Sequence, residues 1–178
     1  MNLSVKSAIE WWRDLQPEPA RKRPGDRAAL AKLHRCATVS AAMQEPATFD
    51  LFRRLGGRGA DDLAVAALTA VVLAHIREDD LTSRSVARRI GPENADKPET
   101  ALVKPLRFRR LMDADTDEER LIAFRRLVAI AGNKLNTEDI AATLLHWTEE
   151  RKRRWVYDYW NAGQPTPSAA SQIEEASS

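Results

Sequence analysis

The sequence contains a single cysteine, Cys36, among 178 residues. One cysteine forms no internal disulfide and supplies no cysteine framework for a zinc finger. Cys36 lies among apolar neighbours on a predicted helix, so we expect a buried thiol. Only seven glycines are present, and alternating runs of Val, Ile and Thr are missing. These absences argue against a fold built on β-strands and predict an all-α protein.

Long apolar runs are missing as well. The most apolar segment, residues 63–73, is too short to cross a bilayer. Residues 1–10 lack the continuous apolar stretch of a signal peptide. We therefore expect a cytoplasmic protein that has no contact with a membrane.

Leu, Ala and Arg recur instead at helical spacing along most of the chain, which predicts a compact bundle of about seven to nine helices. Residues 1–162 are expected to form one helical domain, or two lobes spanning residues 1–100 and 101–162. Residues 163–178 contain Pro, Ser, Ala and Gln without an apolar pattern, which is typical of a disordered tail.

Cap residues and prolines indicate where the helices begin. Ser7 is expected to cap a first helix over residues 8–15, Asp26 a second and Asn136 the last. Thr82 or Ser83 is expected to cap a short helix that ends at residue 90. Residues 63–76 are apolar nearly all round, which indicates a central buried helix that the charged run 78–80 closes.

The last predicted helix carries a long aromatic stripe and reaches residue 160. At 100° per residue its apolar side chains fall on one side, namely Ile140, Leu144, Trp147, Trp155 and Tyr159. Arg151 lies within the stripe, where its guanidinium is placed to stack on a tryptophan ring. This pattern predicts the helix on which the core packs.

No catalytic constellation is visible. The histidines His34, His75 and His146 lie on three separate predicted helices and lack the spacing of a zinc motif. The acidic run 113–119 lacks the glycine and ligand spacing of a calcium loop, and acids are expected at a helix start. We therefore expect no enzyme, no metal, no cofactor and no small-molecule substrate.

The formal charge is only +2, but the basic residues are concentrated. Residues 20–44 hold six Lys and Arg against Asp26 alone, and residues 101–112 hold Lys104 and three arginines with no acid. Such segments indicate binding to nucleic-acid backbone, or a plain solvated surface. A third possibility is that the acids of 113–119 pair with the arginines that precede them.

Five blocks of sequence carry a resemblance to a known family. They are the tryptophan-bearing first helix, GDRAALAKL at 25–33, FDLFRRL at 49–55, LRFRRL at 106–111, and Trp147 followed by WVYDY at 155–159. In this order and spacing they resemble the CasB family over residues 8–162. That family is the small subunit of the type I-E CRISPR surveillance complex called Cascade.

The resemblance implies an all-helical, non-catalytic subunit that lies along the guide RNA and target DNA and helps to hold the displaced strand. The implied partners are CRISPR RNA, target DNA, other Cascade subunits and a second copy of the chain. The positions implied to contact backbone phosphates are Arg27, Lys32, Arg35, Arg53, Arg54, Arg107, Arg109 and Arg110, with Arg88 and Arg89 from a weakly matching segment. His34 departs from the run of arginines expected beside Arg35.

Two other classes of function fit the same residues. A structural scaffold would pair these arginines with acidic surfaces of protein neighbours. A transcriptional regulator would need a recognition helix and a dimer with fixed half-site spacing. Binding to unrelated nucleic acids over a range of salt concentrations distinguishes the three.

Overall fold

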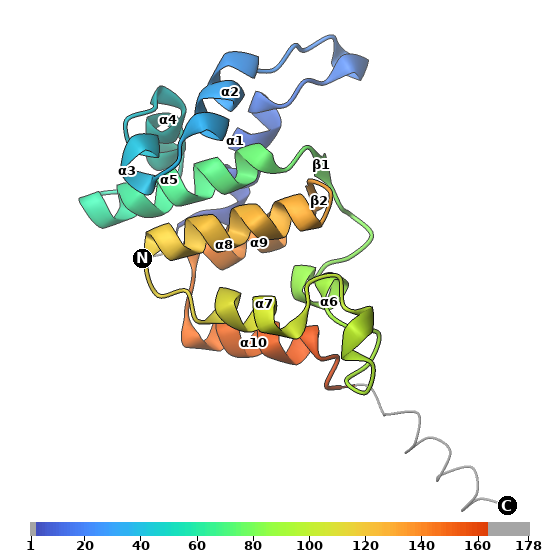
Figure 1. Ribbon diagram of the computed structural model, residues 1–178. Coiled ribbons are helices and arrows are strands. Elements are labelled where there is room, and N and C mark those ends of the chain that lie inside the picture. The colour runs from blue at the N-terminus through green and yellow to red at the C-terminus, as the bar shows by residue number, and fades with distance from the viewer. Residues whose placement is uncertain (1–2, 164–178) are drawn as a thin grey trace, which may run out of the picture.

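The computed structural model describes residues 3–163, so the tail expected at 163–178 lies outside the described residues except for residue 163. Nearly all of the regular secondary structure in the described part is helical, as predicted (Figure 1). Its elements are α1 Val5–Leu15, η1 Pro19–Arg21, α2 Arg27–Arg35, α3 Val39–Ala42, α4 Pro46–Arg54, α5 Ala60–His75, β1 Glu78–Asp79, α6 Val86–Ile90, η2 Pro98–Thr100, α7 Pro105–Met112, α8 Asp117–Ile130, β2 Lys134–Leu135, α9 Thr137–Leu145 and α10 Glu149–Tyr159, where η marks a 3-10 helix. None of these helices is long and apolar enough to span a bilayer.

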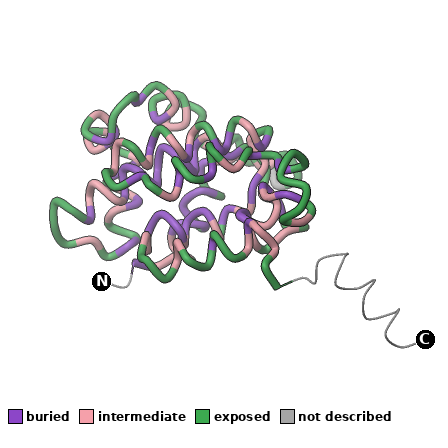
Figure 2. The backbone as a smooth tube through the Cα atoms, turned by 60° about the horizontal axis from the view of Figure 1, so that its bottom comes forward, coloured by how far each residue is buried: buried purple, intermediate pink, exposed green. Residues whose placement is uncertain are grey.

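α5 is the central helix of the fold. It contacts α2, α3, α4, α8 and α9, and residues 66–74 are all buried. A helix that is apolar on every side is stable only when other elements surround it. The predicted buried helix at 63–76 is therefore confirmed, and Figure 2 shows the exposed positions on the outer sides of the helices.

α1 begins earlier than predicted. The side chain of Ser4, not that of Ser7, caps the helix and accepts the Ser7 N–H at 3.2 Å. Trp11 and Trp12 are both buried. Their indole N–H groups donate to the carbonyls of Ala47 and Ile76, at 3.0 and 3.1 Å. Both hydrogen bonds connect distant parts of the chain, so they fix α1 against α4 and the end of α5.

The other caps are partly as predicted. Asp26 caps α2 and Asn136 caps α9. The short helix α6 is capped by Ser85, and not by Thr82 or Ser83, because the Ser85 hydroxyl accepts the Arg88 N–H at 3.2 Å. The Thr82 hydroxyl donates instead to the carboxylate of Asp80 at 2.5 Å.

Residues 78–80 leave α5 and make a contact that the sequence did not predict. β1 pairs in parallel with β2, with Glu78 opposite Lys134. Asp80 follows at 2% exposure and forms an ion pair with Arg89 at 3.0 Å. Hydrogen bonds from Thr82, helped by the positive charge of Arg89, hold the pKa of Asp80 below its usual value. Asp80 therefore stays ionised inside the fold, and hydrogen bonds from Asn136 and Thr137 to Asp80 and Asp79 join the end of α5 to the start of α9.

The predicted final helix is two helices. α9 ends at Leu145, and the Thr148 hydroxyl accepts the Arg151 N–H at 3.2 Å to begin α10. A threonine side chain competes for backbone N–H groups and so favours a new helix start. α9 packs on α1 and α5, whereas α10 packs on α6 and lies beside α7 in Figure 1.

The tryptophans of the stripe still meet across this break. Trp155 is 1% exposed, and its ring centroid lies 5.8 Å from that of Phe124 and 6.5 Å from that of Trp147. Its indole N–H donates to the Thr143 hydroxyl at 3.0 Å. The predicted stacking of Arg151 is wrong: Arg151 pairs with Asp139 at 3.7 Å, and it is Lys152 that lies over the Trp147 ring.

Tyr159 fixes the position of α7. Its ring stacks on Phe108 with centroids 3.8 Å apart, and its hydroxyl donates to the Val103 carbonyl at 2.6 Å. Burial raises the pKa of the Tyr159 hydroxyl to about 12, so it remains a donor at neutral pH. Gly91 ends α6 against the same residue, where an added Cβ would clash with the Tyr159 carbonyl. α6, α7 and α10 therefore meet at one tyrosine.

Replacing Tyr159 with phenylalanine should lower the free energy of unfolding by about 1–3 kcal/mol, because the buried Val103 carbonyl loses its partner. Urea denaturation measures the change. The matched control is Tyr157→Phe, whose parent side chain is 54% exposed and should be replaceable without effect. Equal midpoints for Tyr159→Phe and the unmodified chain would show that this hydrogen bond contributes nothing.

Candidate nucleic-acid interface

α7 presents its arginines to solvent. Pro105 stands at the first helical position, where its missing N–H is not needed. Phe108 and Leu111 are each 3% exposed and fasten one side of the helix to the core. Arg107, Arg109 and Arg110 are all exposed on the remaining sides. The sequence thus makes α7 amphipathic with guanidinium groups as its only polar side chains.

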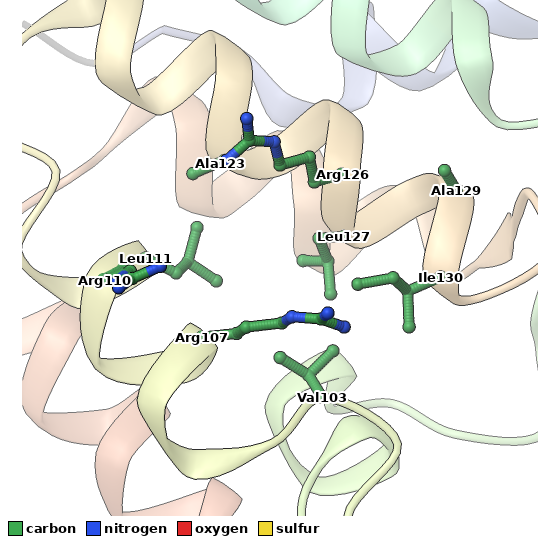
Figure 3. A pocket seen from close by; sticks show the side chains of 9 residues that line it. All are labelled: Val103, Arg107, Arg110, Leu111, Ala123, Arg126, Leu127, Ala129 and Ile130. Atoms are coloured by element: carbon green, nitrogen blue, oxygen red, sulfur yellow. The ribbon is translucent and has the colours of Figure 1, made fainter.

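Two of these arginines meet a third, Arg126 of α8, around a groove between the two helices. The groove has a volume of about 500 Å³ (Figure 3). Its floor is apolar and includes Val103, Leu127 and Ile130, and none of its lining residues is acidic. Three positive charges therefore surround a hollow that is apolar at its base. Arg109 is on α7 too but does not line the groove.

Arg126 was not among the residues expected from the sequence, although a signal for it was present. Residues 121–136 contain Arg125, Arg126 and Lys134 and no acid, which is the same pattern as in residues 101–112. α8 is fixed at its start by a capping box between Thr116 and Glu119. Its charged side chains are thus segregated, with acids in the first turn and the arginine pair further along.

The acidic turn before α8 does not neutralise α7. In the described part of the chain, all of its carboxylates except that of Asp113 have partners elsewhere: Asp115 lies 3.8 Å from Lys152, Asp117 lies 3.2 Å from Arg120, and Glu118 accepts the Val39 N–H at 2.8 Å. Glu119 accepts the backbone N–H groups of Thr116 and Asp115, which lower its pKa. Within residues 3–163, no ion pair joins this turn to Arg107, Arg109 or Arg110. Their charges are left available to a ligand.

Positive side chains continue from α8 to the end of α2. The Arg125 guanidinium donates to the Cys36 carbonyl at the C-terminus of α2, at 3.2 Å. Arg35 is exposed in the last turn of that helix, while Cys36 is buried as predicted. The three elements α2, α8 and α7 therefore follow one another across the molecule, each with exposed arginines.

The other predicted positions on α2 and α4 have more varied surroundings. Arg27 and Arg53 are exposed and make no ion pair within the described residues. Lys32 is exposed but shares a hollow with Asp26, Glu45 and Asp50. Acidic side chains therefore lie close to this side of α2, although few are near it in the sequence. Arg54 is held by two carboxylates, Asp14 at 2.7 Å and Asp50 at 3.0 Å. That residue ties α4 to α1.

The two arginines of α6 are engaged within the fold. Arg88 donates to the carbonyls of Tyr159, Pro92 and Glu93. Arg89 forms the ion pair with Asp80 and also donates to the Lys134 carbonyl. Both side chains stabilise connections between segments, so the structure gives them an internal role.

The fold brings two of the three histidines together. The rings of His34 and His75 lie 4.6 Å apart between α2 and α5, and each ring bonds a backbone carbonyl at 2.7 Å. Burial lowers the pKa of His75, and the positive charge of Arg125 acts in the same direction. The described residues contain no group of three or more potential ligands placed to hold a metal ion.

Known proteins share this sequence pattern and this fold. The model of the family described as CRISPR-associated protein Cse2 matches residues 29–160. No curated protein sequence matches the chain at a significant level. A chain in a crystal structure of E. coli Cascade bound to a PAM-containing double-stranded DNA target is similar in fold, with a TM-score of 0.64. The two chains are 16% identical, and the similarity covers 91% of this chain and 99% of that one.

Proposed function

The chain belongs to the CRISPR-associated protein Cse2 family, also called CasB, and from this premise we propose that it is a non-catalytic subunit of a Cascade-type complex. Its task in that complex is to hold nucleic-acid backbone. The strands are CRISPR RNA and target DNA, including the DNA strand that the guide displaces. Its protein neighbours are the other subunits and a second copy of the same chain.

One observation carries the proposal. Arg107, Arg110 and Arg126 come from two helices, converge on one groove and have no acidic partner within the described residues. Guanidinium groups bind phosphate through paired hydrogen bonds and stay charged at every physiological pH. Rigid helices place them without reading the base sequence, which is the property that a backbone contact requires.

The energetics of strand exchange explain why such contacts suffice. The guide–target duplex is about as stable as the DNA duplex that it replaces, so opening the target is nearly balanced. A few phosphate contacts to a separated strand shift that balance. This role needs no catalytic pocket, and two groups whose pKa values are shifted, Asp80 and Tyr159, serve packing instead.

A salt titration of the full chain tests the proposal. Unrelated fluorescent single strands should bind with similar affinity, and log K should fall with log[salt] by roughly 0.7–0.9 for each phosphate contact. Three arginines give a slope of roughly 2–3 on that scale. Absence of binding at low salt would favour the scaffold role, and strong preference for one sequence would favour a regulator.

A further inference from the structure

The groove between α7 and α8 has a feature that phosphate binding alone does not require. Its base is formed by side chains that are almost fully buried: Val103 is 4% exposed, Leu111 3% and Leu127 2%. The half-buried Ile130 closes one end. A surface that only counters phosphate charge would need the guanidinium groups but no apolar hollow.

We infer that this groove receives one unpaired nucleotide of a single strand, with its base on the apolar floor and its neighbouring phosphates on Arg107, Arg110 and Arg126. The inference rests on the proposed function and adds the form of nucleic acid that the site selects. In a duplex the bases are stacked and paired, so only their edges are accessible to a protein. A separated strand can turn a base outward into a pocket.

The dimensions and chemistry of the groove suit that ligand. A volume of about 500 Å³ lies within the usual range of small-ligand sites and is far too small for a double helix. The Arg107 side chain extends across the floor between Leu127 and Val103 (Figure 3). Its planar guanidinium can stack on a base while the two other arginines bind phosphate.

The floor is also held in place before any ligand arrives. The Val103 N–H donates to the Ile90 carbonyl at 3.0 Å, and the Val103 carbonyl accepts the Tyr159 hydroxyl. The stacked rings of Phe108 and Tyr159 fix α7 from behind. A preformed pocket loses little conformational entropy when it is filled, so a single base is enough to add measurable affinity.

The experiment compares two strands that have the same phosphates. One is a short natural single strand and the other carries the same backbone with abasic sites throughout, both labelled for fluorescence anisotropy. At equal salt the natural strand should bind the full chain about tenfold more tightly, because a stacked base adds affinity that the abasic strand lacks. The duplex of the same sequence should bind like the abasic strand.

A variant that fills the groove without altering charge gives an independent arm. Ala123 lies at the groove and is half-buried, so Ala123→Leu should lower the affinity for the natural strand to that of the abasic strand. The matched control is Ala142→Leu, a half-buried helical alanine on α9 that does not line the groove. The control should retain the tenfold preference. If Ala123→Leu does not fold, comparing the natural and abasic strands on the unmodified chain still tests the inference.

The outcomes separate this inference from the proposed function. Equal binding of natural and abasic strands, with a steep salt dependence, overturns the base pocket and leaves the backbone role intact. Failure of both strands to bind at low salt overturns both. Displacement of the strands by an acidic peptide of equal charge at lower concentration would assign the groove to a protein neighbour, which also overturns the inference.

Discussion

Reversing the charges of Arg107 and Arg110 together is expected to weaken binding of every nucleic-acid sequence alike, by about a hundredfold at low salt. A hydrogen bond to a charged group contributes about 1.5–3 kcal/mol, and 1.4 kcal/mol corresponds to tenfold in affinity. The salt dependence should flatten at the same time by roughly 0.7–0.9 for each phosphate that the variant no longer binds. Fluorescence anisotropy over a range of salt concentrations measures both quantities.

The control for this double variant changes charge by the same amount elsewhere. Arg13 on α1 and Arg58 before α5 are exposed and do not line the groove. Arg13→Glu with Arg58→Glu should therefore leave affinity and slope nearly as in the unmodified chain. If both double variants weaken binding equally, the effect is one of net charge, and α7 has no special role.

Removing the indole of Trp155 has the largest expected effect on the fold. Trp155→Ala should lower the free energy of unfolding by about 3–5 kcal/mol, since a large buried aromatic leaves a cavity. The change also removes the indole N–H that donates to the Thr143 hydroxyl, and the ring that contacts Phe124 and Trp147. Urea denaturation followed by circular dichroism should show a lower midpoint with an unchanged slope.

Tyr157→Ala is the comparison for the tryptophan variant, because that aromatic lies on the same helix and is 54% exposed. Its midpoint should remain close to that of the unmodified chain. Unfolding of Trp155→Ala at the original midpoint would mean that the aromatic cluster does not support the core.

Local signals are sufficient for part of the fold. Asp26 and Asn136 are recognisable as caps because a short polar side chain before an apolar helical pattern usually accepts a hydrogen bond from the first backbone N–H groups of the helix. The apolar run of α5 identifies the buried helix for a similar reason, since no other placement hides all of its sides. Ser4 is harder to predict because Ser7 offers the same chemistry three residues later, and only the packing of α1 selects between them.

Tertiary contacts decide the rest. The aromatic stripe from Ile140 to Tyr159 fits one long helix, yet the Thr148 cap divides it so that α10 can lie against α6. The pairing of Glu78 with Lys134 joins residues that are 56 positions apart, and no local pattern indicates it.

The candidate site shows the same division between local and distant information. An acid-free segment identifies α7, but the sequence does not show that Arg126 completes the groove. It also does not show that carboxylates of the acidic turn interact with Lys152, Arg120 and the backbone N–H of Val39. Lys32 shows the converse: its own stretch of sequence has few acids, but the fold brings this part of α2 beside acids of α4.

The parallel pairing of β1 with β2 also bears on how freely the chain can vary in length. It brings the two ends of the segment that contains α6, α7 and α8 to the same place, so that segment is a closed loop. The entropy of closing a loop grows only with the logarithm of its length, and each doubling adds about 0.6 kcal/mol. Extra residues are tolerated least at Gly91, which fits against Tyr159, and most in the exposed stretch 95–100 that follows. Related chains can therefore lengthen this connection without changing how α7 and α8, which form the groove, are placed relative to each other.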